Sequence, residues 1–87
     1  MMTGTTSSGF SYEVEDEILD DYELLELLNE ADNGKAGAML DVVERVLGKE
    51  QTEALKGHIR NESGRVSAKR MITEVMEILK SHGAGKN

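Results

Sequence analysis

The second half of the sequence constrains the fold most, because it describes two helices separated by a short polar turn. Residues 49–60 have a helical pattern with a narrow apolar face. Residues 61–67 contain the Asn, Ser and Gly that end helices, and Ser67 is a favourable N-cap for a helix over residues 67–81. The apolar stripe of that last helix is broad and consists of Ala68, Met71, Ile72, Val75, Met76, Ile78 and Leu79.

Two more helices are predicted upstream, over residues 21–33 and 35–47. Each carries a wide apolar stripe, and the breaks between helices fall at Gly34 and Gly48. The first stripe consists of Leu24, Leu25, Leu27, Leu28 and Ala31, and the second of Met39, Leu40, Val42, Val43, Val46 and Leu47.

The composition favours a helical fold with an aliphatic core. The chain of 87 residues has no Pro, Cys or Trp, and only one Phe and two Tyr. We therefore expect an all-α fold, a small bundle of about four helices with a disordered or extended N-terminal arm. The residues expected to be mostly buried are Leu28, Val43, Val46, Leu55, Ile72, Val75 and Leu79.

The N-terminal arm is expected to have little regular structure. Residues 1–9 offer nothing apolar to bury beyond Met, so disorder is predicted there. Phe10, Tyr12 and Val14 then alternate with polar residues, which favours an extended segment pinned in a groove, or else a β-pair with a second chain. The predicted organisation is an acidic, flexible arm over residues 1–20, a helical domain over 21–81 and a flexible tail over 82–87.

The charge is distributed unevenly within the net value of −7. Residues 1–34 hold ten acidic residues and no Lys or Arg, whereas residues 35–87 hold seven acidic and ten basic residues. The acidic half is either solvated, or it meets a basic partner, or it folds back on the chain's own basic residues. These are Arg60, Arg65, Lys69 and Arg70.

No catalytic, cofactor or metal site is predicted, and we do not expect an enzyme. An EF-hand loop centred on Gly64 would place Ile59 and Arg70 at the ends where calcium needs carboxylates. His58 and His82 lie far apart in the sequence and have no accompanying ligand motif. The sequence contains no signal peptide pattern and no apolar run that could span a bilayer, so a cytoplasmic location is expected.

Four segments of the sequence form a recognisable pattern. They are Phe10-x-Tyr12-Glu13-Val14, Leu19-Asp20-Asp21-Tyr22-Glu23-Leu24-Leu25-Glu26, Leu47-Gly48-Lys49-Glu50-Gln51-x-x-x-Leu55-Lys56, and Gly64-Arg65-Val66 leading into an apolar helix. Together they resemble small tail assembly chaperones of long-tailed (siphovirus-type) bacteriophages or prophages. The resemblance covers roughly residues 10–79. It implies a helical protein of the host cell cytoplasm that binds the tape measure protein while tail tube subunits are recruited during virion assembly.

On this interpretation the partners are the tape measure protein and the tail tube protein; self-association is left open, and neither membrane nor nucleic acid is expected. The surface that binds the partner is expected on the first and last helices, at Leu24, Leu27, Leu28, Met71, Val75 and Ile78. The alternative is a small helix-turn-helix regulator associated with nucleic acid, with Lys69 and Arg70 at the start of its last helix. The net negative charge and the acidic Glu74 and Glu77 on that helix argue against this alternative.

Overall fold

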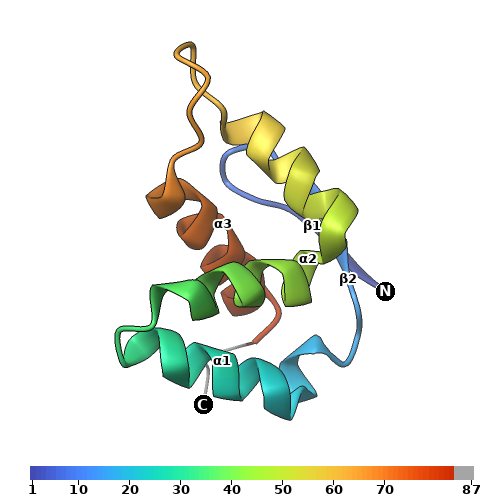
Figure 1. Ribbon diagram of the computed structural model, residues 1–87. Helices are drawn as coiled ribbons and strands as arrows, with labels where there is room; N and C mark the ends of the chain where they lie inside the picture. Colours follow the sequence, from blue (N-terminus) through green and yellow to red (C-terminus); the bar gives the residue numbers. More distant parts are fainter. Residues whose placement is uncertain (84–87) are drawn as a thin grey trace.

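The fold contains three helices and a two-stranded antiparallel sheet (Figure 1), in a computed structural model that describes residues 1–83. The prediction of an all-α bundle of four helices is therefore wrong. The elements are β1 (Met2–Thr5), β2 (Ser11–Val14), the short 3-10 helix η1 (Ile18–Asp20), α1 (Tyr22–Asp32), α2 (Ala36–Ile59) and α3 (Ala68–Ser81).

Helix α2 contains both of the middle helices that the sequence predicts as separate. The backbone at Gly48 is not helical (φ 76°, ψ 168°), and this conformation is essentially restricted to glycine. The chain changes direction there, so the two halves of α2 run at an angle to each other (Figure 1). The predicted break at Gly48 is therefore confirmed, as a non-helical residue between the two helical segments of α2.

The sheet accounts for the main error in the predicted fold. The prediction of disorder over residues 1–9 is wrong, because β1 pairs with β2, with Met2 opposite Val14 and Thr5 opposite Ser11. The alternation along β2 was informative, since Tyr12 and Val14 are buried. By contrast, β1 has only one large apolar residue, so the side-chain pattern gave no strand signal there; its partner strand and its loop contacts hold it in place.

The outer edge of β2 is covered by a side chain from α2. The Gln51 Oε1 atom accepts a hydrogen bond from the Glu13 amide N–H at 2.7 Å, and Gln51 Nε2 donates to the Glu13 carbonyl oxygen at 2.6 Å. The primary amide of Gln51 therefore bonds to β2 as the backbone of a neighbouring strand would.

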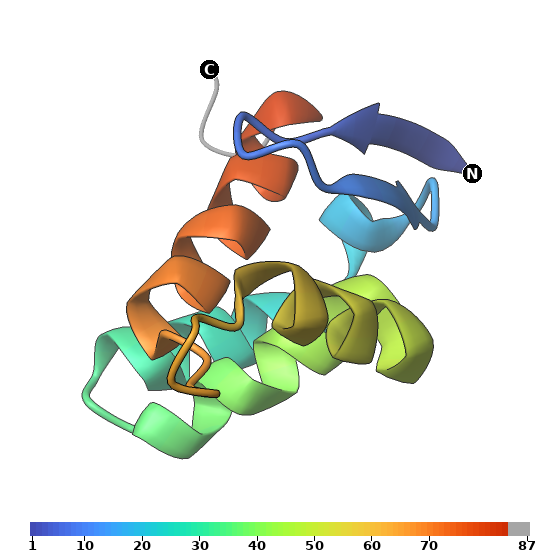
Figure 2. The ribbon, with the colours of Figure 1, turned by 90° about the horizontal axis from the view of Figure 1, so that it is seen from above.

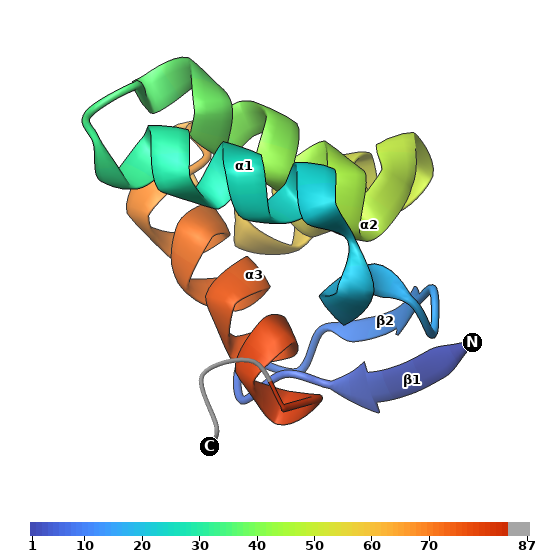
Figure 3. The ribbon, with the colours of Figure 1, turned by 90° about the horizontal axis from the view of Figure 1, so that it is seen from below.

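The core lies between α2 and the elements around it. Figure 2 shows the sheet beside the C-terminal half of α3 and above the second half of α2, and Figure 3 shows α1 and α3 diverging on the opposite side. Of the residues predicted to be buried, Val43, Val46, Leu55, Val75 and Leu79 are buried, whereas Leu28 and Ile72 are only partly buried. β2, the loop before it and η1 supply further core residues, namely Phe10, Tyr12, Val14 and Ile18.

A capping residue joins the start of α1 to α2. Asp21 is the N-cap of α1, where its Oδ1 accepts from the N–H groups of Glu23 at 3.0 Å and Leu24 at 3.3 Å. Arg45 on α2 donates through Nε to Asp21 Oδ2 and through Nη2 to Glu23 Oε1 at 2.9 Å. The hydrogen bond from Arg45 is the main reason why the pKa of Asp21 is lowered.

The acidic N-terminal half does not fold back on the basic residues of the 60–70 segment. In the described part of the chain, its ion pairs join Asp16 to the Met1 amine, Asp21 and Glu23 to Arg45, and Glu30 to Lys35. Glu13, Glu15 and Glu17 are exposed. The structure therefore favours the interpretation in which most of these acids are solvated.

The lowered pKa of Asp21 predicts a contribution to the pH dependence of stability. The folded state favours the ionised carboxylate, so this stabilisation is present at neutral pH and is lost as the pH falls below about 4. Asn is also a good N-cap but carries no charge, so Asp21→Asn should lose less stability than the wild type between pH 7 and pH 3. Urea unfolding at the two pH values measures this, with Asp41→Asn on α2 as the exposed control. Equal losses in the wild type and Asp21→Asn would contradict the assignment.

Candidate functional site

A cluster of polar side chains lies where the loop between β1 and β2 (residues 6–10, called the hairpin loop) meets α3. The Thr6 and Ser8 hydroxyls donate to the same oxygen of Glu74, at 2.7 and 2.8 Å. The Ser7 amide and hydroxyl donate to the two oxygens of Glu77, at 2.6 and 2.8 Å. Glu74 and Glu77 lie one turn apart on α3, and Glu74 is only 5% exposed. These two carboxylates hold the hairpin loop on α3.

A histidine from α2 joins this cluster, but the geometry does not form a catalytic triad. The Nε2 atom of His58 lies 3.1 Å from the Ser8 hydroxyl and 3.1 Å from the Ser8 carbonyl oxygen. In a triad the acid would bond to the other imidazole nitrogen and orient the ring. Here Glu74 accepts from Ser8 itself, and within residues 1–83 no acid bonds to His58 to orient it as a base. The cluster fixes the hairpin loop in place.

The second histidine also serves the sheet. His82 Nε2 lies 2.9 Å from the Tyr12 hydroxyl oxygen, and the two rings meet edge to face with centroids 5.8 Å apart. The predicted flexible tail over residues 82–87 thus begins with a residue that contacts the core, while residues 84–87 lie outside the described part. Residues 1–83 contain no group of three or more His, Cys, Asp or Glu side chains that could hold a metal ion.

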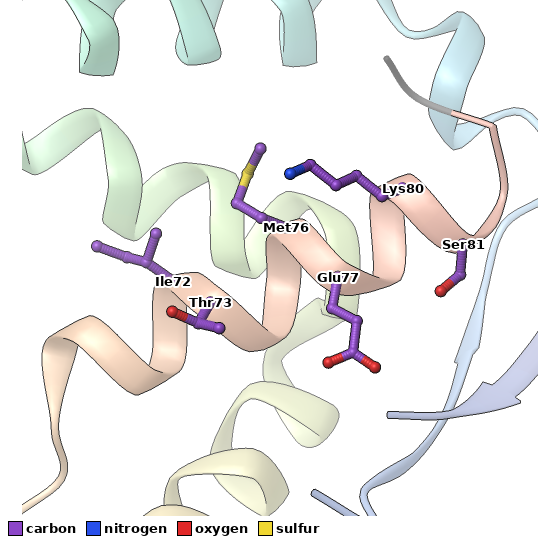
Figure 4. A pocket seen from close by; sticks show the side chains of 6 residues that line it. All are labelled: Ile72, Thr73, Met76, Glu77, Lys80 and Ser81. Atoms are coloured by element: carbon purple, nitrogen blue, oxygen red, sulfur yellow. The ribbon is translucent and has the colours of Figure 1, made fainter. Parts of the chain in front are cut away.

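An open groove runs along the outer face of α3. Ile72, Met76 and Lys80 line one side at four-residue spacing, and Thr73, Glu77 and Ser81 line the other (Figure 4). Ile72 and Met76 are half-buried, so each presents part of its apolar surface to solvent. Met76 and Lys80 project to the side of α3 on which α1 lies (Figure 4). The apolar stripe of α3 is therefore wider than the surface that α2 and the sheet cover.

The structure divides the six predicted partner-binding residues into two groups. Leu24, Val75 and Ile78 are 3%, 0% and 1% exposed, so they belong to the core of this chain and present no surface to a partner in this conformation. Leu27, Leu28 and Met71 are partly buried and pack at the margin of the core.

Sequence reasoning also missed three strongly exposed apolar residues on the helices. Tyr22 and Leu40 are each 72% exposed, and Leu25 is 60% exposed. Tyr22 and Leu25 lie on the outer face of α1, and an open groove on that helix is lined by Tyr22, Glu23, Glu26, Leu27, Asn29, Glu30 and Arg45. The sequence could have indicated this exposure through the apolar stripe of the first helix, because that stripe is wider than one packed helix face needs.

No known family model matches the chain, and neither the curated proteins nor the solved structures give a similar one. Over residues 1–83, no helix combines the length and the apolar character needed to cross a bilayer. The fold and the candidate site together define a small mixed α/β chain whose charged clusters are used for internal contacts and whose outer helix faces carry partly exposed apolar residues.

Proposed function

We propose that this chain is a phage tail assembly chaperone, an interaction protein without catalytic activity that binds the tape measure protein and assists tail tube assembly in the host cell cytoplasm. The resemblance over residues 10–79 supports this proposal. A chaperone for a long helical client needs a surface that is apolar enough to bind and charged enough to stay soluble.

The observation that carries the proposal is the groove on α3. One side of the groove offers the partly exposed side chains of Ile72 and Met76 together with the positive charge of Lys80, and the other side carries the negative charge of Glu77. Methionine is flexible and polarisable, so it adapts to apolar partners of different shape. The groove follows the helix axis, which suits a client helix with apolar anchors at i, i+3, i+4 and i+7.

Leu27 and Leu28 on α1 belong to a different surface from the α3 groove. Both are partly buried, and Leu27 lines the open groove on α1. The proposed partner surface, called the α3 groove surface, therefore consists of Ile72 and Met76 with the charged Glu77 and Lys80 beside them. Leu24, Val75 and Ile78, which the sequence also suggested, are buried in the core and are not part of this surface.

Co-expression with the tape measure protein tests the proposal. The wild-type chain should keep the client soluble and form a complex with it on size exclusion, and Met76→Glu should reduce the recovered complex at least about tenfold. Leu40→Glu introduces the same charge at an exposed position of α2 and should leave the complex intact. If the client is equally soluble with and without this chain, and no complex elutes, the proposal fails.

One observation favours a second candidate, the helix-turn-helix regulator. Glu74 and Glu77, which would repel a nucleic acid, turn toward the hairpin loop, and Lys69 and Arg70 are exposed at the start of α3. However, the segment between α2 and α3 is longer than the usual three- or four-residue turn. Binding to duplex DNA that weakens steeply with added salt would support the regulator.

A further inference from the structure

The backbone hydrogen-bonding groups are occupied at one outer edge of the sheet and open at the other. The edge of β2 is occupied by Gln51, which bonds to both the N–H and the C=O of Glu13. Within residues 1–83, no hydrogen bond joins any other part of the chain to the outer edge of β1. Figures 2 and 3 show β1 at the periphery of the molecule, on the side of the sheet away from α1 and α2.

The register shows which backbone groups this edge presents. Thr3 lies opposite Glu13, whose N–H and C=O point away from β1 toward Gln51. In an antiparallel ladder, such a pair directs the backbone groups of both residues outward. Thr3 therefore directs its N–H and C=O to the outer edge, and Thr5 does the same two residues later. The Thr6 N–H bonds inward to the Phe10 carbonyl oxygen at 2.9 Å, which agrees with this alternation.

We propose that β1 pairs with β1 of a second copy of this chain, antiparallel, to form a continuous four-stranded sheet. A two-fold axis beside Gly4 places Thr3 opposite Thr5 of the second copy, and Thr5 opposite its Thr3. Each of these pairs exchanges two N–H···O bonds, so the four outward groups of each β1 are satisfied. Two helical layers then lie on the same face of the joined sheet.

The charge distribution favours a second copy as the occupant. Each chain carries a net charge of −7, so most faces of two copies repel each other. Residues 1–12 contain no charged side chain, and β1 is therefore a place where two acidic chains can approach closely. The edge also lacks the Lys, Pro or bulge with which proteins protect exposed strands, and threonine is favourable for strand pairing.

Amide hydrogen exchange resolved by residue tests the pairing. The Gly4 amide bonds inward to β2 and should be protected at every protein concentration. The Thr3 and Thr5 amides should be open at low micromolar concentration and become protected by at least about tenfold at millimolar concentration, in parallel with dimer formation in analytical ultracentrifugation. A chain that stays monomeric, with Thr3 and Thr5 unprotected at millimolar concentration, overturns the proposal.

Two variants locate the contact. Thr3→Pro removes one N–H group from the outer edge of β1 and none of those that bond to β2. Thr3→Lys/Thr5→Lys places lysines of the two copies directly opposite each other in the paired sheet. Both variants should abolish the dimer. The control Ala54→Lys/Thr73→Lys adds the same charge at exposed helix positions and should dimerise as the wild type does. Protection at Gly4 reports whether each variant keeps its hairpin. A dimer that persists in the lysine variant places the interface elsewhere and overturns the proposal.

Discussion

Replacing Leu55 with alanine is expected to lower the free energy of unfolding by about 3–5 kcal/mol. Leu55 is 0% exposed and belongs to the apolar cluster that also contains β2, α2 and α3 side chains. The substitution removes buried methyl groups and leaves a cavity that the surrounding elements fill only in part. Since a domain of this size has a stability of about 5–10 kcal/mol, the loss should be visible as a large drop in the urea midpoint.

Leu40→Ala is the matched control for this effect. Leu40 is also on α2, but it is 72% exposed, so its truncation should change the free energy of unfolding by no more than about 0.5 kcal/mol. Far-UV circular dichroism in urea measures both variants. Similar losses for Leu40→Ala and Leu55→Ala would contradict the placement of the core.

Replacing Glu74 with alanine is expected to lower the free energy of unfolding by about 2–3 kcal/mol. This is a large effect for a charged residue on a helix. Its carboxylate accepts hydrogen bonds from Thr6 and Ser8, and the buried Thr6 hydroxyl would lose this acceptor. Glu74→Gln keeps the shape and one acceptor oxygen, so it should recover part of the loss. Urea unfolding gives the free energies, and amide exchange at Gly4 should show the hairpin opening more often in Glu74→Ala.

Glu77→Ala is the comparison that shows how much the burial of the Glu74 hydrogen bonds contributes to stability. The Glu77 carboxylate also bonds to the hairpin loop through Ser7, but these hydrogen bonds are exposed to solvent. Removing the Glu77 carboxylate should lower the free energy of unfolding by only about 0.5–1 kcal/mol. If Glu74→Ala is no more harmful than Glu77→Ala, burial of the Glu74 contact does not contribute to stability.

The helices could be predicted because their signals are local. The Ser67 cap lies next to the apolar stripe that it precedes, and it accepts a hydrogen bond from the first turn of α3 as expected. Asp21 accepts in the same way at the start of α1. Gly48 was also informative, since its positive φ marks the change of direction in α2.

The sheet could not be predicted because its stabilising contacts are distant in sequence. β1 has little apolar character of its own, and the groups that hold the hairpin loop come from Glu74, Glu77 and His58. Seen in the sequence alone, Glu74 and Glu77 belong to the polar face of a helix. The same limitation affected the partner surface: a wide stripe does not distinguish the side that becomes core, such as Val75, from the side that stays open, such as Met76.

The contact between the hairpin loop and α3 has a consequence for the order of folding. Thr6 and Glu74 are 68 positions apart, and Ser7 and Glu77 are 70 apart, so the hairpin of β1 and β2 is held by a helix far along the chain. The hairpin loop therefore lacks these contacts in any partly folded state in which α3 has not yet docked, and the native arrangement forms as a chain-wide event. Contacts of such long sequence separation also slow folding, because the two ends of the chain must meet before the contacts are gained.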